Sequence, residues 1–294
     1  MPTPLIFAVV VLIWGTTWFA IKFQLGVVAP EVSLVYRFGL AAACVFVFAR
    51  VTGSPLSLSW QDHRFVALQG ATLFCLNYWL TYLSTQYLTS GLVAVLFTSI
   101  IFFNLVNSRV IFGAAVEPRV LAAAAAGVIG VALLFLPELR AALGNPRILH
   151  GAGLALGATY LASLGNMAAT RNTRGGLPVV TVNAYGMAYG AIGLALIAVL
   201  RGTPVAFDWH WPYVVSLLYL SLAGTSLAFS LYLALIRRIG ATRASYSSVL
   251  FPVVALAVST VFESYRWSLP ALVGLAALVA GNALALGGAQ VARR

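Results

Sequence analysis

Residues 121–133, LAAAAAGVIGVAL, and residues 272–284, LVGLAALVAGNAL, are small-residue apolar stretches that lie 151 positions apart. Seven of their 13 aligned positions are identical, and Gly130 aligns with Gly281. Before each stretch the chain has the same order of parts: an apolar segment, a short polar break and a second apolar segment. This shared order indicates that the chain is a doubled unit.

The composition predicts an integral membrane protein. The 294 residues are 62% hydrophobic and 8% charged, with a mean hydropathy of +0.98, whereas soluble domains carry about 25% charged residues. Residues 65–108 contain 44 positions without a charged side chain, enough to cross twice at roughly 20 residues per span. The apolar runs are too long and too uniform for barrel strands, so they predict helices.

The all-α fold expected from these runs has ten transmembrane helices, five in each half. One repeat occupies residues 1–143 and the other residues 144–294. Because five is odd, the second repeat enters the membrane from the opposite side, and the repeats are inverted. Inverted repeats are typical of secondary transporters that bind substrate near the midplane and expose it alternately to each side. The expected spans are 4–21, 32–49, 65–84, 91–108, 120–136, 151–170, 178–200, 213–236, 244–262 and 269–289.

Basic residues predict the orientation, because they collect on the cytoplasmic side of membrane proteins. With the N-terminus inside, eleven of the 17 lysine and arginine residues lie on that face and five on the other, while Arg37 falls within a span. Both termini are therefore expected in the cytoplasm. The net charge of +11 then reflects topology, and no nucleic-acid partner is expected.

Four motifs carry a resemblance to a known family: WGTTWFAIK (14–22), YRFGLAAA (36–43), TSGLVAVLFTSI (89–100) and ATRASYSSVLFPVVAL (241–256). Their order and spacing resemble the drug/metabolite transporter superfamily, specifically its EamA-type exporters with two five-helix repeats. The resemblance implies a ten-helix exporter of small metabolites, commonly amino acids, in the bacterial cytoplasmic membrane. Many members place a proline in both the fourth and the ninth helix, whereas here Ile101 is the counterpart of Pro252.

The first span carries a candidate binding face. Trp14, Trp18 and Lys22 are spaced at i, i+4 and i+8, so they share one side of a helix. Two aromatic rings that end in a cation could hold an apolar body and meet a carboxylate. Alternatively, Trp18 and Lys22 are interfacial anchors, with the lysine reaching toward the headgroups.

Polar and aromatic side chains within other spans are further candidates. Such groups must face the bundle interior or a water-filled cavity, because an unpaired polar group in hydrocarbon costs several kcal/mol. They line a substrate path or make hydrogen bonds between helices. The candidates are Asn77, Tyr78, Thr81 and Tyr82 in the third span, Ser99 in the fourth, Tyr160 and Asn166 in the sixth, Asn183, Tyr185 and Tyr189 in the seventh, and Ser247 in the ninth.

Four residues are assigned to structure or gating. Arg37 either extends outward to Glu31 or nearby carbonyls, or binds an anionic group, since an unpaired arginine in a span is costly. Pro252 is a hinge or a static kink. Gly130 and Gly281 occupy the same place in the two matched stretches and are assigned a structural or gating role.

Several classes of function are disfavoured. No P-loop, HExxH or GxSxG motif is present, no nucleophile with a base can be assembled for a membrane-embedded enzyme acting on lipid, and no cofactor or metal is expected, because Cys44 and Cys75 fall inside spans. An ion channel would need oligomeric symmetry, whereas two repeats make a complete path, so a monomer in the lipid bilayer suffices. All six acidic residues fall at span ends or in loops, which favours facilitated transport or coupling without a buried carboxylate.

The expected substrate is an amphipathic small molecule of amino-acid size. Aromatic amino acids such as tryptophan best match the Trp and Tyr surfaces, and threonine, methionine or an apolar drug would also fit. A nucleotide sugar is the leading alternative from the same superfamily, although few basic groups lie within the spans to hold a diphosphate.

Overall fold

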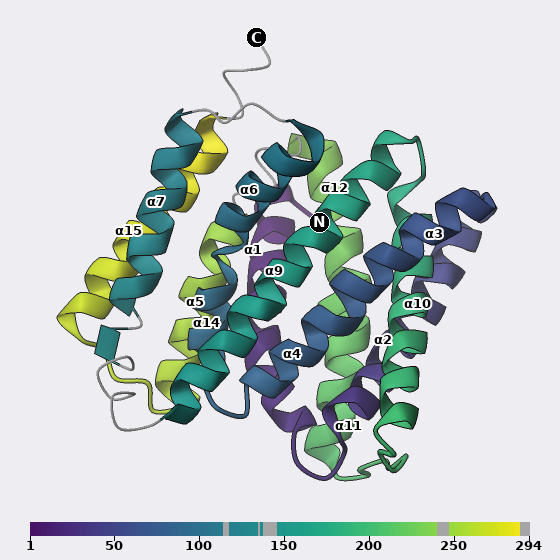
Figure 1. The fold of residues 1–294 in the computed structure, drawn as a ribbon, viewed down its shortest axis with the longest axis horizontal. Coiled ribbons are helices and arrows are strands. Elements are labelled where there is room, and N and C mark those ends of the chain that lie inside the picture. Colours follow the sequence, from purple (N-terminus) through teal and green to yellow (C-terminus); the bar gives the residue numbers. More distant parts are fainter. Residues whose placement is uncertain (114–117, 135, 138–145, 240–246, 289–294) are drawn as a thin grey trace.

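The computed structural model describes residues 1–113, 118–134, 136–137, 146–239 and 247–288, and every regular element within these ranges is a helix (Figure 1). The first half contains α1 (Thr3–Ala20), η1 (Ile21–Gln24), α2 (Pro30–Val51), α3 (Trp60–Gln69), η2 (Gly70–Leu76), α4 (Asn77–Ser84), α5 (Ser90–Phe97), α6 (Ile100–Phe112) and α7 (Pro118–Leu134). The second half contains α9 (Pro146–Arg174), α10 (Val179–Leu200), α11 (Trp211–Leu218), η3 (Tyr219–Leu227), α12 (Ala228–Ile239), α14 (Ser247–Phe262) and α15 (Leu269–Gly288).

The helices make this a multi-pass integral membrane protein. Five segments of the described chain are long and apolar enough to cross a membrane, and shorter apolar helices accompany them. The count of ten spans and the positions of the termini remain predictions. The expected boundary between the repeats at 143–144, Glu117 and Glu138 lie outside the described residues. The five long segments are 3–24, 30–51, 90–112, 146–174 and 179–200, and the shorter ones are 125–134, 211–227, 250–262 and 269–281.

The third predicted span, and the eighth, each contain a π-helical segment. In the first half η2 lies between α3 and α4, and in the second half η3 lies between α11 and α12. Both mark close contacts: a side chain at Gly70 would meet the Gly186 carbonyl oxygen at 2.6 Å, and the Gly224 carbonyl accepts a hydrogen bond from Trp14. Both π-helical segments therefore lie at close contacts with a neighbouring helix.

The fourth predicted span is interrupted, although it lacks proline. Helix α5 ends at Phe97 and α6 begins at Ile100. The hydroxyls of Thr98 and Ser99 donate to the carbonyls three residues earlier, at 2.6 Å each. Such local hydrogen bonds compete with regular helix geometry. Pro252, in contrast, lies inside α14, which continues to Phe262.

The interruption separates two packing environments. Helix α5 contacts α1, α9 and α14, whereas α6 packs mainly against α9 and α7. Val95 on α5 belongs to a buried apolar cluster with Leu256 on α14, Leu134 on α7 and Leu278 on α15. A second cluster joins α2, η2, α10 and η3 around Phe38. The central helices therefore pack around two apolar cores.

Helices α7 and α15 lie side by side at one edge of the bundle (Figure 1). Gly130 faces Gly274, because a side chain at Gly130 would lie 2.7 Å from the Gly274 carbonyl oxygen, and the converse distance is also 2.7 Å. Gly281, which aligns with Gly130 in the sequence, is buried on α15, but the close contact of Gly130 is with Gly274. Sequence alignment of the two stretches thus identified equivalent positions and not contacting ones.

Substituting Gly130→Ala should destabilise the protein by about 1–3 kcal/mol, because the obstructing atoms are backbone and cannot rotate away. Gly127→Ala is the matched control on the same helix, since nothing lies within 4 Å of its added carbon. Thermal unfolding of the purified variants in detergent measures both. Equal midpoints for Gly130→Ala and Gly127→Ala would contradict the packing described here.

Candidate functional site

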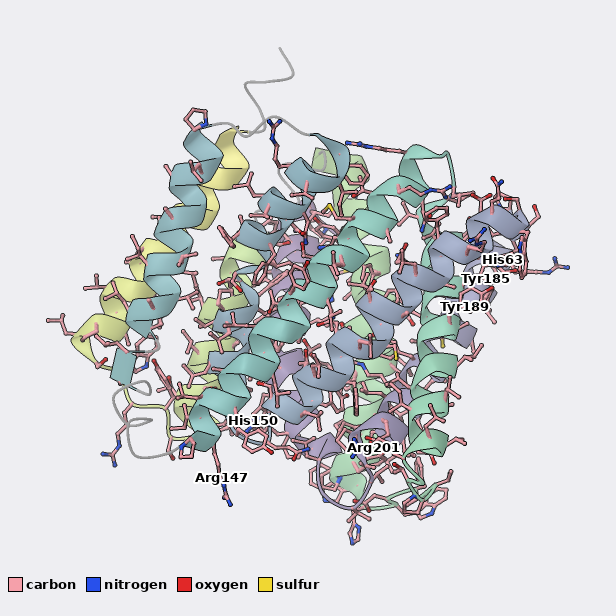
Figure 2. All side chains as sticks on the ribbon, viewed as in Figure 1. His63, Arg147, His150, Tyr185, Tyr189 and Arg201 are labelled. Atoms are coloured by element: carbon pink, nitrogen blue, oxygen red, sulfur yellow. The ribbon has the colours of Figure 1, made fainter. Side chains whose placement is uncertain are left out.

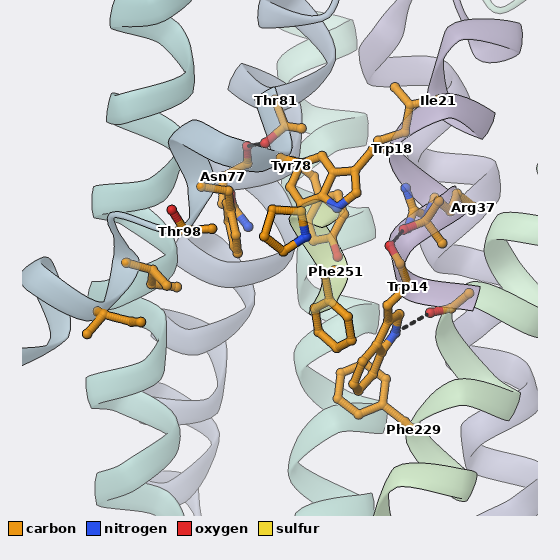
Figure 3. A pocket seen from close by; sticks show the side chains of 17 residues that line it. Trp14, Trp18, Ile21, Arg37, Asn77, Tyr78, Thr81, Thr98, Phe229 and Phe251 are labelled. Atoms are coloured by element: carbon orange, nitrogen blue, oxygen red, sulfur yellow. Dashed lines mark hydrogen bonds between the residues drawn. The ribbon is translucent and has the colours of Figure 1, made fainter. Parts of the chain in front are cut away.

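A central cavity of about 260 Å³ lies among the helices of both halves (Figure 3). The residues that surround it come from α1, η1, α2, α4, α5, α6, η3, α12 and α14 and from the turn between α5 and α6, so it is assembled from segments far apart in the chain. Its lining is mostly apolar and aromatic. The lining residues are Trp14, Thr17, Trp18, Ile21, Arg37, Asn77, Tyr78, Thr81, Ala94, Phe97, Thr98, Ile100, Ile101, Gly224, Phe229, Phe251 and Pro252.

Trp14 is the centre of an aromatic cluster on one wall. Its ring centroid lies 5.4 Å from that of Phe229, 5.2 Å from Tyr232 and 5.3 Å from Phe251. Its indole N–H donates to the Gly224 carbonyl at 3.0 Å, which fixes the ring orientation. The indole is thus held by edge-on contacts and one hydrogen bond, and it presents a rigid apolar surface to the cavity.

Trp18, one turn further along α1, also lines the cavity and lies 5.2 Å from Phe97 on α5. Both tryptophans of the face predicted for the first span therefore line the same cavity. Their function as binding residues stays a prediction.

The predicted face of the third span also meets the cavity. Asn77, Tyr78 and Thr81 on α4 line it. The Asn77 amide nitrogen donates to the Leu73 carbonyl at 3.0 Å, and its oxygen is buried without a hydrogen-bond partner. Tyr82 lies behind this surface and is fully buried.

Arg37 on α2 is 2% exposed and lines the cavity. Its guanidinium carbon lies 4.8 Å from the Tyr78 ring centroid and 5.4 Å from that of Phe38. One terminal nitrogen donates to the Tyr82 hydroxyl at 3.2 Å, and Nε has no hydrogen-bond partner.

The alternative in which Arg37 reaches outward to Glu31 is contradicted by the structure. The Glu31 carboxylate forms an ion pair with Arg201 at 3.2 Å. It also accepts hydrogen bonds from the Thr203 hydroxyl at 2.8 Å and from the Trp79 indole N–H at 3.2 Å. These three groups come from the segment that follows α10 and from α4, which no spacing within α2 could reveal.

Lys22 lies in η1, directly after α1, and it is not among the residues that line the cavity. Its amine is 3.4 Å from a Glu263 carboxylate oxygen and donates to the Leu88 carbonyl at 2.8 Å. The same carboxylate accepts from the Ser90 amide at 3.0 Å and from the hydroxyls of Ser90 and Ser259. We name these five residues, Lys22, Leu88, Ser90, Ser259 and Glu263, the ionic cluster; it connects η1, α5 and the end of α14.

Hydrogen bonds and the nearby lysine keep the Glu263 carboxylate of the ionic cluster ionised. Glu263 lies in the connection after α14, with a side chain that is 10% exposed. Burial raises the pKa of its carboxyl, but hydrogen bonds from Ser259 and Ser90 and the charge of Lys22 outweigh burial, so the net pKa is below the ordinary value. Glu263 therefore stays ionised at neutral pH.

Several predicted site residues lie away from the cavity. Figure 2 shows Tyr185 and Tyr189 grouped with His63, where Tyr189 contacts His63 Nδ1 at 2.7 Å and Tyr185 donates to the Leu56 carbonyl at 3.0 Å. Asn183 accepts a long hydrogen bond from Gln69, and it lines a second, apolar cavity of about 290 Å³ beside α2, α10 and η3. The others are Ser99, Tyr160, Asn166 and Ser247. The Ser99 hydroxyl donates to the Leu96 carbonyl of α5, and the Asn166 amide donates to the Asn104 side chain. Tyr160 is 43% exposed, and Ser247 is buried at the start of α14.

Sequence patterns do not indicate Phe97, Phe229, Phe251 or Glu263 as site residues. Phenylalanine is frequent in this chain, with 17 copies, so no local signal separates a cavity ring from a lipid-facing one. Glu263 was recognised as an acid at a span end, but its partner Lys22 lies 241 positions earlier. Only the folded arrangement brings these residues together.

The sequence model of the EamA-like transporter family matches residues 1–136 and again residues 149–287. The chain belongs to the EamA-like transporter family. The membership predicted from its motifs is confirmed.

Relatives of this EamA-like chain come from bacteria. It is 24% identical to the uncharacterized transporter YvbV of Bacillus subtilis (strain 168), over 94% of this chain and 89% of that protein. It is 24% identical to the uncharacterized transporter YoaV of the same organism, over 84% of both, and 22% identical to protein PagO of Salmonella typhimurium (strain LT2), over 96% and 92%. A solved crystal structure aligns with a TM-score of 0.69 over 99% of both chains at 19% identity, which shows a shared fold. The chain is thus a membrane transporter by family.

Lys22 and Glu263 of the ionic cluster should contribute to the free energy of unfolding as a coupled pair. Lys22→Met and Glu263→Gln are each expected to lower the thermal midpoint in detergent, whereas the double variant should lose less than the sum. A coupling of about 0.5–3 kcal/mol is typical of contacting residues in one network. Strictly additive losses would show that the two side chains do not stabilise each other.

Proposed function

We propose that this EamA-like transporter exports amino acids, foremost aromatic ones such as tryptophan and also threonine or methionine, across a bacterial cytoplasmic membrane. Substrate passes through the central cavity between the two five-helix repeats by alternating access. Both termini lie in the cytoplasm. The observation that carries the proposal is the aromatic lining of a small cavity that is shared by both halves of the chain.

The cavity suits a substrate of amino-acid size. Its volume of about 260 Å³ lies just below the ~300–1,000 Å³ of pockets that hold drug-sized ligands. Trp14, Trp18 and Tyr78 offer flat surfaces against which an aromatic or aliphatic side chain can pack.

The same lining disfavours the nucleotide-sugar alternative. Arg37 is the single charged side chain among the described residues around the cavity. A diphosphate carries at least two negative charges and is normally held by several cationic or amide donors, and a nucleotide sugar is also much larger than an amino acid.

Alternating access is supported by the ion pair and hydrogen bonds that join helices at one end of the cavity. The ionic cluster joins η1, α5 and the end of α14, at the end that lies outside the cell in the orientation proposed here. The Gly91 amide also donates to the Ser259 hydroxyl at 2.8 Å, and a side chain at Gly91 would lie 2.8 Å from that hydroxyl. For export, this end must open, with the Thr98–Ser99 interruption and Pro252 as the places where the two helices can bend.

The coupling mechanism follows from the charges. No carboxylate belongs to the cavity lining in the part of the chain that the structure describes, and Glu263 is held ionised at the closed end. We infer facilitated transport along the substrate gradient, so that uptake into liposomes should not require a proton gradient.

Liposomes that contain the purified protein should take up labelled tryptophan faster than protein-free liposomes. Trp18→Ala should raise the KM for tryptophan about ten-fold, since losing an aromatic contact costs roughly 1–1.5 kcal/mol or more, and should affect threonine less. Trp60→Ala is the matched control, because Trp60 is 79% exposed on α3. Uptake of a nucleotide sugar in place of amino acids would overturn the proposal.

Locking the closed end should stop transport. The hydroxyls of Ser90 and Ser259 lie 3.2 Å apart, so Ser90→Cys with Ser259→Cys should form a disulfide in a background where Cys44 and Cys75 are alanine. Oxidation should abolish most tryptophan uptake, and a reducing agent should restore it in the same sample. Full uptake with the cross-link formed would show that this end does not open.

A further inference from the structure

Two polar atoms of the central cavity are buried and have no hydrogen-bond partner. They are Nε of Arg37 and Oδ1 of Asn77, and the two residues are 2% and 3% exposed. Buried polar atoms are almost always satisfied in folded proteins, because leaving one unpaired is costly. Two such atoms in one cavity therefore point to a ligand that supplies the missing partners.

The charge of Arg37 has no counter-ion in the described part of the chain. Each acidic side chain there has another partner: Glu31 has Arg201, Asp62 has Arg171, Asp208 has His210 and Glu263 has Lys22. The rings of Tyr78 and Phe38 stabilise the cation only in part. An anionic group on the ligand would complete the pairing, and a guanidinium matches the planar shape of a carboxylate.

Asn77 offers the opposite chemistry. Its amide nitrogen is used by the Leu73 carbonyl, and this hydrogen bond determines which way the amide is oriented. The remaining Oδ1 can only accept, so the complementary ligand group is an N–H or an O–H.

The two residues lie on different sides of the cavity. In Figure 3, Arg37 and Asn77 lie well apart, with Tyr78 and Trp18 between them. One small group cannot satisfy both. A ligand with an anion at one end and a hydrogen-bond donor at the other, joined by a flat apolar body, fits this order of donor, aromatic surface and acceptor.

We propose that Arg37 binds the carboxylate of the substrate and that Asn77 Oδ1 accepts a hydrogen bond from the ring N–H or O–H at the far end of its side chain. The transporter therefore selects aromatic amino acids that carry a polar ring hydrogen, tryptophan and tyrosine, over phenylalanine. This inference rests on the proposed function and assigns two specificity-determining residues to it.

The test is binding measured by calorimetry with the full chain in detergent, with tryptophan, tryptamine and 1-methyltryptophan as ligands. Tryptamine lacks the carboxylate, and 1-methyltryptophan lacks the ring N–H. The wild type should bind tryptophan about ten-fold more tightly than either analogue, because each analogue leaves one buried polar group unpaired.

The variants should produce a crossed pattern. Arg37→Gln should remove the preference for tryptophan over tryptamine and keep the preference over 1-methyltryptophan, whereas Asn77→Leu should do the reverse. Arg37→Lys should retain part of the preference for the carboxylate. A misfolded variant would weaken all three ligands together, so the preserved preference in each variant is the internal control.

Each remaining outcome overturns a distinct claim. If the wild type binds tryptophan but both variants keep both preferences, the two assignments fail and the amino-acid transporter stands. If a variant weakens the binding of all three ligands equally while its thermal midpoint is unchanged, that residue does not bind the ligand group assigned to it. If the wild type binds no amino acid, the proposed function fails and the assignments fail with it.

Discussion

The bilayer imposes the constraint on which the rest of this structure depends: inside hydrocarbon, each backbone N–H and C=O must be paired by the protein itself. Long helices meet this demand, and departures from regular helix are allowed only where protein or a cavity surrounds them. The structure follows that rule. The π-helical segment η3 and the turn at Thr98–Ser99 border the central cavity, and η2 lies against α10. Irregular backbone is thus concentrated where helices must approach closely or bend.

The sequence predicted helical faces well, because a helix repeats every 3.6 residues and side chains four apart share a side. Trp14 and Trp18, together with Asn77, Tyr78 and Thr81, line one cavity, whereas Tyr82 from the same predicted face is buried behind it. Periodicity cannot say which neighbour a face meets. Tyr185 and Tyr189 have the same spacing, yet their helix turns them toward His63. The same limit applies to Gly130, whose aligned position is Gly281 but whose contact is Gly274.

Contacts between distant parts of the chain account for most of what the sequence did not reveal. The spacing within its own helix predicts Lys22 as the cationic end of a binding face, because this spacing contains no information about partners from distant segments. Its amine is instead used by Glu263 and Leu88. Phe229 and Phe251 pack on Trp14, but nothing local distinguishes them from an exposed phenylalanine such as Phe262 on α14. In a chain that is 62% hydrophobic, composition carries little information about which apolar side chains are interior.

The buried charged side chains fall into two groups: those that the protein itself neutralises and those that have no counter-ion among the described residues. Glu31 and Glu263 each have a cation and further hydrogen-bond donors, so they join segments and need nothing else. Arg37 is as deeply buried as Glu31, but within the part of the chain that the structure describes it meets only aromatic faces and one phenol hydroxyl. A buried cation left in this state costs free energy in a membrane, and a static structural role would be served better by an acid beside it. The absence of such an acid among the described residues leaves the guanidinium available to an anion that enters and leaves, which is what a transporter requires.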